Sequence, residues 1–258
     1  MSNKNTKKND INKAVFRFYE ELNDFLPPDK EKKDFEYFFK GNPAVKDAVE
    51  AIGVPHPEID LIIVNGKSVD FSYQLKHNDR IAVYPEFESI DISPIIKLRP
   101  SPLRTILFIL DVQLGKLAKM LRILGFDTLY NPAFTSDDIV NISLKQKRII
   151  LTRDRALLKL KSVTHGYWVR SEIPDKQTKE IIKRFDLLSS VNPFSRCAIC
   201  NSKTMPVKKE DIDDLLQEKT RKYYDDFMQC TGCKRIYWKG SHYRKILLKI
   251  KEITGVDF

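Results

Sequence analysis

The sequence predicts an α/β fold organised around a parallel sheet flanked by helices. Residues 105–155 alternate between apolar runs typical of strands and amphipathic runs typical of helices, in the order strand, helix, strand, helix, strand. Such alternation predicts parallel pairing with right-handed crossovers. A strand-rich segment precedes this region, and two close pairs of cysteines follow it. We therefore expect three folded parts.

The first folded part is expected over residues 14–92, after a polar, disordered tail at residues 1–13. Strand-like composition is found in AVFRFYE, DFEYFF, IDLIIV and DRIAVYP, whereas PAVKDAVEAIG has the Pro and Gly positions of a helix. Asn65 and Gly66 follow an apolar run and predict a hairpin turn. The order strand, strand, helix, strand, strand predicts a β-grasp fold.

This N-terminal part resembles the ubiquitin-like and sulfur-carrier group in its segments IIVNGKSV and LKHNDRIAVYP. Sulfur carriers need a free C-terminal Gly-Gly, but here the last strand continues into a further domain, so we reject sulfur transfer. We interpret the part as a docking or positioning domain that offers a surface for a protein partner, with a structural appendage as the alternative. Prolines at positions 94, 100 and 102 mark residues 93–104 as a linker.

The second folded part, residues 105–192, carries an aspartate at three successive junctions. Asp111 closes its first strand, Asp137 opens its second helix and Asp154 closes its third strand. Parallel strands end at one edge of their sheet, where ligands and catalytic groups lie. Carboxylates gathered there favour a bound hard cation such as Mg²⁺ or Mn²⁺. The alternative is that each aspartate only caps a helix.

Basic residues accompany these aspartates. Lys116, Lys119 and Arg122 recur every three residues and are expected on one exposed helix face, opposite a buried leucine stripe. Arg153 and Arg155 flank Asp154. Cations around an acidic pocket suit metal-assisted cleavage of a polyanion, because they can hold its phosphates.

Net charge is distributed unevenly along the chain. Residues 1–92 hold 13 basic and 17 acidic side chains, residues 93–192 hold 18 and 9, and residues 193–258 hold 14 and 9. The excess of cations therefore coincides with the second and third parts, as binding to a nucleic-acid backbone requires. A lysine-rich surface without a specific partner is the alternative.

The third part, residues 193–258, contains two C-x2-C pairs. They are Cys197 with Cys200 and Cys230 with Cys233. Two pairs at this spacing can place four thiolates around a structural Zn²⁺ as a zinc ribbon, and a closed four-cysteine site leaves no open position for catalysis.

Cations alternate with aromatic rings after the second cysteine pair, and this mixture suits phosphate contacts and base stacking on single-stranded RNA. The alternative is that the rings form a small core around the metal. The basic RNA-binding candidates of this part are Lys239, His242 and Arg244.

Several motifs together resemble a known family. The segments LDVQLGKLAKMLRILGFDTLY, SDD, RIILTRDRALL and GYWVR, followed by the CxxC pairs and YWKGSHY, are similar to the PIN-like RNase domain named after the C-terminal region of the Mut-seven exonuclease. The resemblance covers roughly residues 105–249 and implies a metal-dependent ribonuclease with Asp111, Asp137 and Asp154 as metal ligands. A fourth acid, which PIN nucleases use, is not obvious; Asp138 and Asp175 are the candidates.

We therefore expect a ribonuclease that hydrolyses phosphodiester bonds of single-stranded or structured RNA with Mg²⁺ or Mn²⁺. The alternative is a non-catalytic RNA-binding adaptor that keeps the fold and the basic surfaces. No apolar run approaches the ~20 residues that span a bilayer, and the polar N-terminus lacks the apolar core of a signal peptide. With cysteines in metal-type pairs, a cytoplasmic protein without a membrane partner is expected.

Overall fold

The computed structural model describes residues 11–85 and 106–258. They form two compact units. One unit combines the described N-terminal residues with Arg155–Gly166, and the other contains residues 106–154 and Tyr167–Phe258. The predicted fold class is confirmed: the chain has an N-terminal β-sheet domain, a parallel sheet flanked by helices and a C-terminal cysteine cluster.

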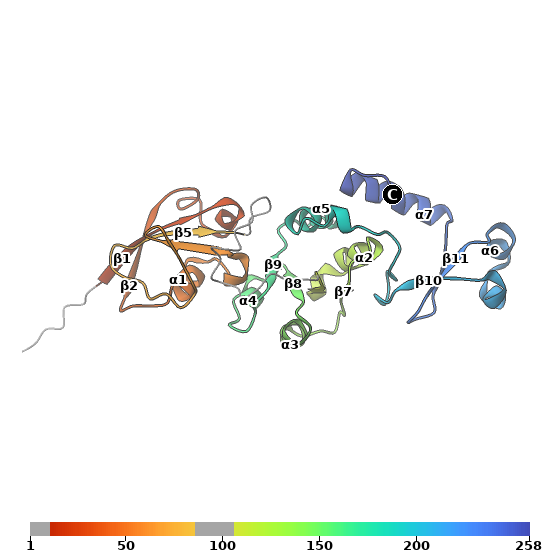
Figure 1. The fold of residues 1–258 in the computed structure, drawn as a ribbon, viewed down its shortest axis with the longest axis horizontal. Helices are drawn as coiled ribbons and strands as arrows, with labels where there is room; N and C mark the ends of the chain where they lie inside the picture. Colours follow the sequence, from red (N-terminus) through yellow and green to blue (C-terminus); the bar gives the residue numbers. More distant parts are fainter. Residues whose placement is uncertain (1–10, 86–105) are drawn as a thin grey trace, which may run out of the picture. The chain divides into compact units, whose positions relative to one another are not determined.

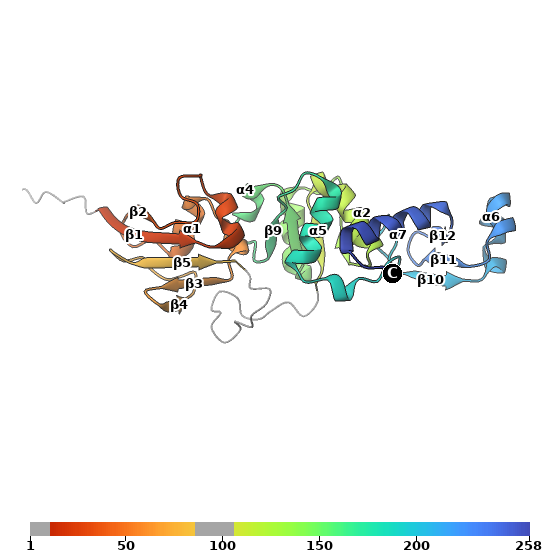
Figure 2. The same ribbon diagram turned by 90° about the horizontal axis from the view of Figure 1, so that it is seen from above.

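The first unit is built on a mixed five-stranded sheet in the order β2-β1-β5-β3-β4 (Figure 2). The central strands β1 and β5 pair in parallel, and the other neighbours are antiparallel. Its elements are β1 (Ile11–Phe18), β2 (Phe35–Lys40), α1 (Val45–Ile52), β3 (Leu61–Val64), β4 (Lys67–Val69) and β5 (Arg80–Tyr84), with 3-10 turns at Glu20–Phe25 and His56–Glu58.

Local sequence explains the buried face of β1 and the turn between β3 and β4. Phe16 and Phe18 of β1 are fully or almost fully buried and stack at 6.1 Å between ring centroids, and each such burial contributes about 1.5–3 kcal/mol. Asn65 and Gly66 both have positive φ, 49° and 81°, which the two-residue turn between β3 and β4 requires. β1 begins at Ile11, three residues before the predicted start of the domain.

Residues Arg155–Gly166 cluster with this first unit, although the sequence places them within the predicted part 105–192. They include the short helix α4 (Arg155–Leu158). Nε2 of His56 lies 2.6 Å from the carbonyl oxygen of Val163, and Nζ of Lys159 donates to the carbonyl oxygen of Glu50 at 3.2 Å. Contacts made more than a hundred positions apart therefore hold this segment.

The second unit contains a four-stranded sheet in the order β7-β6-β8-β9. β6 pairs in parallel with both β7 and β8, and every residue of β6 and β8 is buried, as expected for strands covered on both faces. The elements are β6 (Phe108–Leu110), a 3-10 turn (Val112–Leu114), α2 (Gly115–Ile123), β7 (Thr128–Leu129), α3 (Ser136–Gln146), β8 (Ile149–Thr152), β9 (Gly166–Trp168) and α5 (Pro174–Arg184), with a 3-10 turn at Leu188–Ser190.

Helices cover this sheet. α2 packs against α5, and α5 packs against α7 (Ser241–Thr254). Figure 1 shows α3 on the opposite side of the strands from α5. The crossover β7-α3-β8 passes β6 in the opposite direction to β6-α2-β7, and right-handed crossovers in opposite directions put their helices on opposite faces.

The C-terminal ribbon is an antiparallel sheet in the order β10-β11-β12. Ile212, Leu216 and Phe227 form a small apolar core, against which Val207 and Ile236 of this sheet pack. Its elements are β10 (Thr204–Val207), 3-10 turns (Lys209–Asp211 and Asp213–Leu215), α6 (Glu218–Tyr223), β11 (Phe227–Cys230) and β12 (Ile236–Trp238). No helix in the described ranges 11–85 and 106–258 is long and apolar enough to cross a membrane.

Candidate active edge and cysteine metal centre

Asp111 lies where β6 ends, beside the end of β8. Its backbone N–H donates to the carbonyl oxygen of Leu151 at 3.0 Å, and its side chain accepts from the N–H of Val112 at 2.5 Å. The carboxylate is buried and accepts a second hydrogen bond, 2.8 Å long, from the hydroxyl of Thr152. The side chain therefore caps the next turn, as the alternative interpretation expects, and is also held in one orientation.

Thr152 links Asp111 to Asp154. Its side-chain oxygen, which donates to Asp111, accepts a hydrogen bond of 2.8 Å from the backbone N–H of Asp154. Thr152 is fully buried, whereas Asp154 is exposed. We did not predict a role for Thr152 from the sequence; its signal was a polar residue in the buried strand IILT, two positions before Asp154.

Asp137 is exposed in the first turn of α3, next to a capping box. The hydroxyl of Thr135 accepts from the N–H of Asp138, and Oδ2 of Asp138 accepts from the N–H and hydroxyl of Thr135 at 2.9 and 2.8 Å. These hydrogen bonds lower the pKa of Asp138, because they stabilise its charged form. Asp138 thus caps α3.

The second candidate for a fourth acid, Asp175, is engaged on another helix. Its carboxylate forms an ion pair with Lys249 of α7 at 2.7 Å, and both side chains are partly exposed. The pair joins the first turn of α5 to α7. These contacts do not connect Asp138 or Asp175 to Asp111, Thr152 or Asp154.

The predicted basic residues fall into different environments. Lys116 and Lys119 are exposed on α2, as predicted. Arg153 donates to the carbonyl oxygens of Arg170 and Ser171, and Arg155 lies 5.0 Å from the ring centroid of Phe25. In the C-terminal part, the exposed RNA-binding candidates are Lys239, His242 and Arg244.

Arg122 was wrongly predicted to share the exposed face of Lys116 and Lys119. It is only 5% exposed. Its guanidinium donates to the carbonyl oxygens of Thr128 at 2.8 Å and Ile199 at 2.6 Å. Burial lowers the pKa of Arg122, and the nearby thiols Cys197 and Cys200 oppose that shift. Arg122 therefore joins α2 and β7 to the first cysteine turn.

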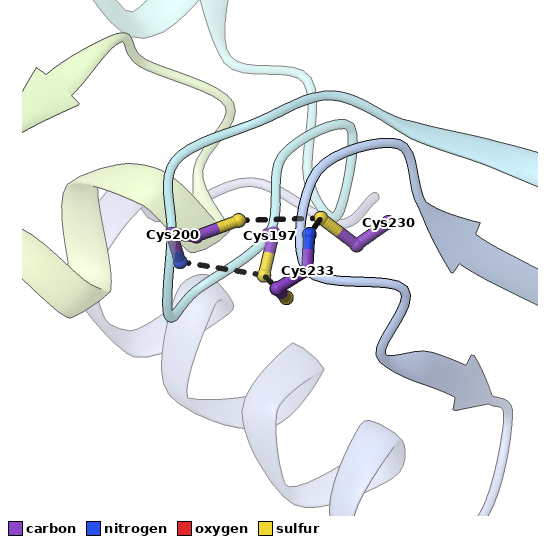
Figure 3. Close-up of side chains that lie close together, drawn as sticks. All are labelled: Cys197, Cys200, Cys230 and Cys233. Carbon is purple, nitrogen blue, oxygen red and sulfur yellow. Dashed lines mark hydrogen bonds between the residues drawn. The ribbon is translucent and has the colours of Figure 1, made fainter.

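The four cysteines converge in Figure 3, where the two turns bring their sulfur atoms together. The four Sγ atoms lie within 4.8 Å of one another, with 3.6 Å between Cys197 and Cys233 and 3.3 Å between Cys200 and Cys230. All four are free thiols. The N–H groups of Cys200 and Cys233 each point at the first sulfur of their own pair, at 3.5 and 3.4 Å. This donor set fits a structural metal such as zinc.

Burial and hydrogen bonds shift the pKa values of individual thiols in opposite directions. Burial raises the pKa of Cys200, but hydrogen bonds from Ser202 and from the neighbouring cysteines outweigh it and lower that pKa to about 5. Burial and the hydrogen bond with Cys200 raise the pKa of Cys230 to about 12. The hydroxyl of Tyr237 lies 3.0 Å from Sγ of Cys197 and can orient it.

The first cysteine turn covers the open edge of the parallel sheet. Oδ1 of Asn201 accepts from the N–H of Thr128 at 2.9 Å, and Arg122 donates to the Thr128 carbonyl oxygen. Thr128 lies in the edge strand β7, where its outward N–H and carbonyl oxygen would otherwise lack partners. Asn201 and Arg122 supply those partners. Nδ2 of Asn201 donates to Asp127, which also pairs with Arg148 at 2.7 Å.

The described residues 11–85 and 106–258 contain one group of three or more potential metal ligands close enough to hold an ion, and it is the cysteine cluster. Asp111, Asp137 and Asp154 do not form such a group, and their role as metal ligands stays a prediction. The carboxyl ends of β6 and β8 do bring Asp111 beside the turn that carries Asp154.

Comparison with protein families gives two matches. Residues 106–250, more than half of the chain, match the model of the Mut7-C RNase domain. Residues 11–91 match the model of the Mut7-C ubiquitin domain. Searches of curated proteins and of solved structures found no match.

Proposed function

Because the chain belongs to the Mut7-C RNase domain family, we propose that it is a metal-dependent ribonuclease that hydrolyses RNA phosphodiester bonds. The observation that carries the proposal is the link Asp111–Thr152–Asp154 at the ends of two adjacent parallel strands. Catalytic groups of α/β sheets lie at this edge. Both aspartates, and Asp137 in the first turn of α3, lie inside the matched region.

Each residue has a proposed role. Asp111, Asp137 and Asp154 would hold Mg²⁺ or Mn²⁺, ions that prefer oxygen ligands. Such an ion supplies activation of water and neutralisation of negative charge on the phosphate. Thr152 keeps the Asp111 carboxylate in one orientation through its 2.8 Å hydrogen bond. Lys116 and Lys119, exposed on α2, would contact RNA phosphates.

The N-terminal β-grasp is proposed as a docking or positioning module. Its last described strand, β5, ends at Tyr84, and the chain continues from there into the RNase domain. A covalent carrier function would need a free chain end at this point, so binding is proposed in its place, with a structural appendage as the alternative. A protein partner is the proposed ligand of its surface.

Asn substitutions test the catalytic proposal, because they remove charge while keeping side-chain shape. Asp111→Asn and Asp154→Asn should abolish RNA cleavage with Mg²⁺ or Mn²⁺, by more than about 100-fold. Asp154→Asn should leave thermal stability in metal-free buffer nearly unchanged, whereas Asp111→Asn should lower it, because an amide has one acceptor oxygen for the two hydrogen bonds from Val112 and Thr152. Asp186→Asn is the matched control: Asp186 is exposed in the same unit, with a φ of 44° that Asn tolerates.

A non-catalytic RNA-binding adaptor is the second candidate. It is favoured by one observation, namely that among the described residues the cysteines alone form a group close enough to hold a metal ion. Wild-type protein that binds RNA but cuts none with any divalent ion would establish the adaptor and reject the ribonuclease. Wild-type cleavage rates in Asp111→Asn would likewise reject the proposed site.

A further inference from the structure

The exposed face of α5 carries a row of three lysines, which we call the α5 lysine row: Lys176, Lys179 and Lys183. Their spacing of three and four residues puts them within about 60° of one another around the helix and along about 10 Å of its length. The opposite face, with Thr178 and Ile181, is buried. The row is therefore one continuous basic surface.

The acidic residues of α5 do not neutralise this row. Asp175 is paired with Lys249 at 2.7 Å. Glu180 points the other way, since its carboxylate accepts from the hydroxyl of Tyr167 at 3.0 Å and from the N–H of Arg170 at 2.8 Å. Glu172, just before the helix, pairs with Arg153 at 2.7 Å.

Across residues 11–85 and 106–258, none of the three lysines has an ion pair or a side-chain hydrogen bond. Other surface lysines do, such as Lys209 with Asp225 at 2.8 Å. Like charges on neighbouring turns of a helix repel one another. A bound polyanion would relieve that repulsion, so the row is suited to a ligand with closely spaced negative charges.

The start of α5 is tied to the turn that contains Asp154. Arg153 donates to the carbonyl oxygen of Ser171 at 2.7 Å, and the same oxygen accepts from the side chain of Gln177 at 2.9 Å. Two hydrogen bonds therefore join the first turns of α5 to the residue before Asp154. α5 also packs against α2, the helix that exposes Lys116 and Lys119.

We propose that the α5 lysine row binds the phosphate backbone of single-stranded RNA and guides the strand toward Asp111 and Asp154. The inference rests on the ribonuclease function proposed above for its choice of polyanion. Lysines act as point charges without base contacts, so this binding is independent of sequence. One exposed apolar side chain, Ile173, precedes the row, and a single side chain inserts little apolar area into a lipid surface, which disfavours a membrane as the ligand.

The test measures RNA affinity separately from cleavage. In an Asp111→Asn background, binding of a fluorescent oligouridylate is titrated at several salt concentrations, with and without the triple change Lys176→Gln, Lys179→Gln and Lys183→Gln. Each lost contact with a single strand lowers the slope of log affinity against log salt by about 0.7, so the triple variant should lose about 2. The control is a triple Gln variant of three exposed lysines of the first unit, Lys33, Lys40 and Lys67.

A reduced slope in the α5 variant and an unchanged slope in the control would support the proposal. Equal slopes in all three proteins would overturn it, and so would poly-glutamate competing for the row as strongly as RNA. The same lysine changes in the otherwise wild-type chain should raise KM and leave kcat nearly unchanged. Cleavage that is absent from the wild-type chain would reject the ribonuclease, while the slopes would still decide the role of the row.

Discussion

The hydroxyl of Thr152 donates a 2.8 Å hydrogen bond to the buried carboxylate of Asp111. Because Thr152 is fully buried, water cannot easily replace its hydroxyl. Thr152→Val keeps the shape but removes the donor, and should cost about 1–3 kcal/mol of unfolding free energy. It should also lower kcat about ten-fold, equivalent to ~1.4 kcal/mol, with KM unchanged.

Thermal unfolding and steady-state cleavage measure these two effects. Thr152→Ser retains the hydroxyl and should restore most of the cleavage rate, which a purely steric role of the methyl group would not explain. Full activity in Thr152→Val would show that this hydrogen bond does not position Asp111.

Adjacent aspartates in α3 should have different roles. Asp138 caps the helix through Thr135, whereas Asp137 takes no part in that capping box. Asp138→Ala should lower the unfolding temperature at neutral pH and preserve cleavage at low temperature. Asp137→Ala should abolish cleavage and leave the unfolding temperature nearly unchanged. A loss of cleavage in a folded Asp138→Ala protein would instead make Asp138 the fourth acid.

The capping contribution of Asp138 should depend on pH. Its folded-state pKa lies below the unfolded value of about 3.9, so its stabilisation is complete above that pH and disappears as the pH falls through the lower, folded value. The difference in unfolding temperature between wild type and Asp138→Ala should therefore shrink in acid. A difference that stays constant down to the acid transition would contradict this account.

Replacing Arg122 should affect folding more than RNA binding. Arg122→Met leaves the carbonyl oxygens of Thr128 and Ile199 without their donor, at a cost of about 2–5 kcal/mol. Lys119→Ala, an exposed change on the same helix, should leave unfolding unchanged and reduce the salt slope of RNA binding. Equal stability of both variants in chemical denaturation would show that the Arg122 contacts contribute little.

Metal removal should loosen the edge of the parallel sheet. Purified protein should contain one zinc per chain, and chelation should lower its unfolding temperature. Since Asn201 of the first cysteine turn accepts from the Thr128 N–H, exchange of that amide should accelerate on chelation. The amide of Ile81, in the first unit, is the control. A zinc-free, disulfide-bonded protein with a protected Thr128 would contradict the prediction.

Periodicity and spacing predicted most of the helices and strands. The apolar run at β6, the helix pattern of α2 and the apolar run at β8 each depend on neighbours within a few positions, and these elements formed where expected. The short strand β4 was not predicted, since Lys67–Val69 carries little apolar signal and is held by pairing with β3. The capping box at Thr135 and Asp138 can also be found from local sequence.

The sequence by itself thus determined the order of the elements, the junctions that carry Asp111 and Asp154, and the convergence of two cysteine pairs. Tertiary structure decided which charged groups are buried. Arg122 has the helical spacing of an exposed lysine, yet an edge strand and a turn 77 positions away supply its acceptors. Burial of a polar group depends on distant partners that satisfy its hydrogen bonds, and no local pattern records them.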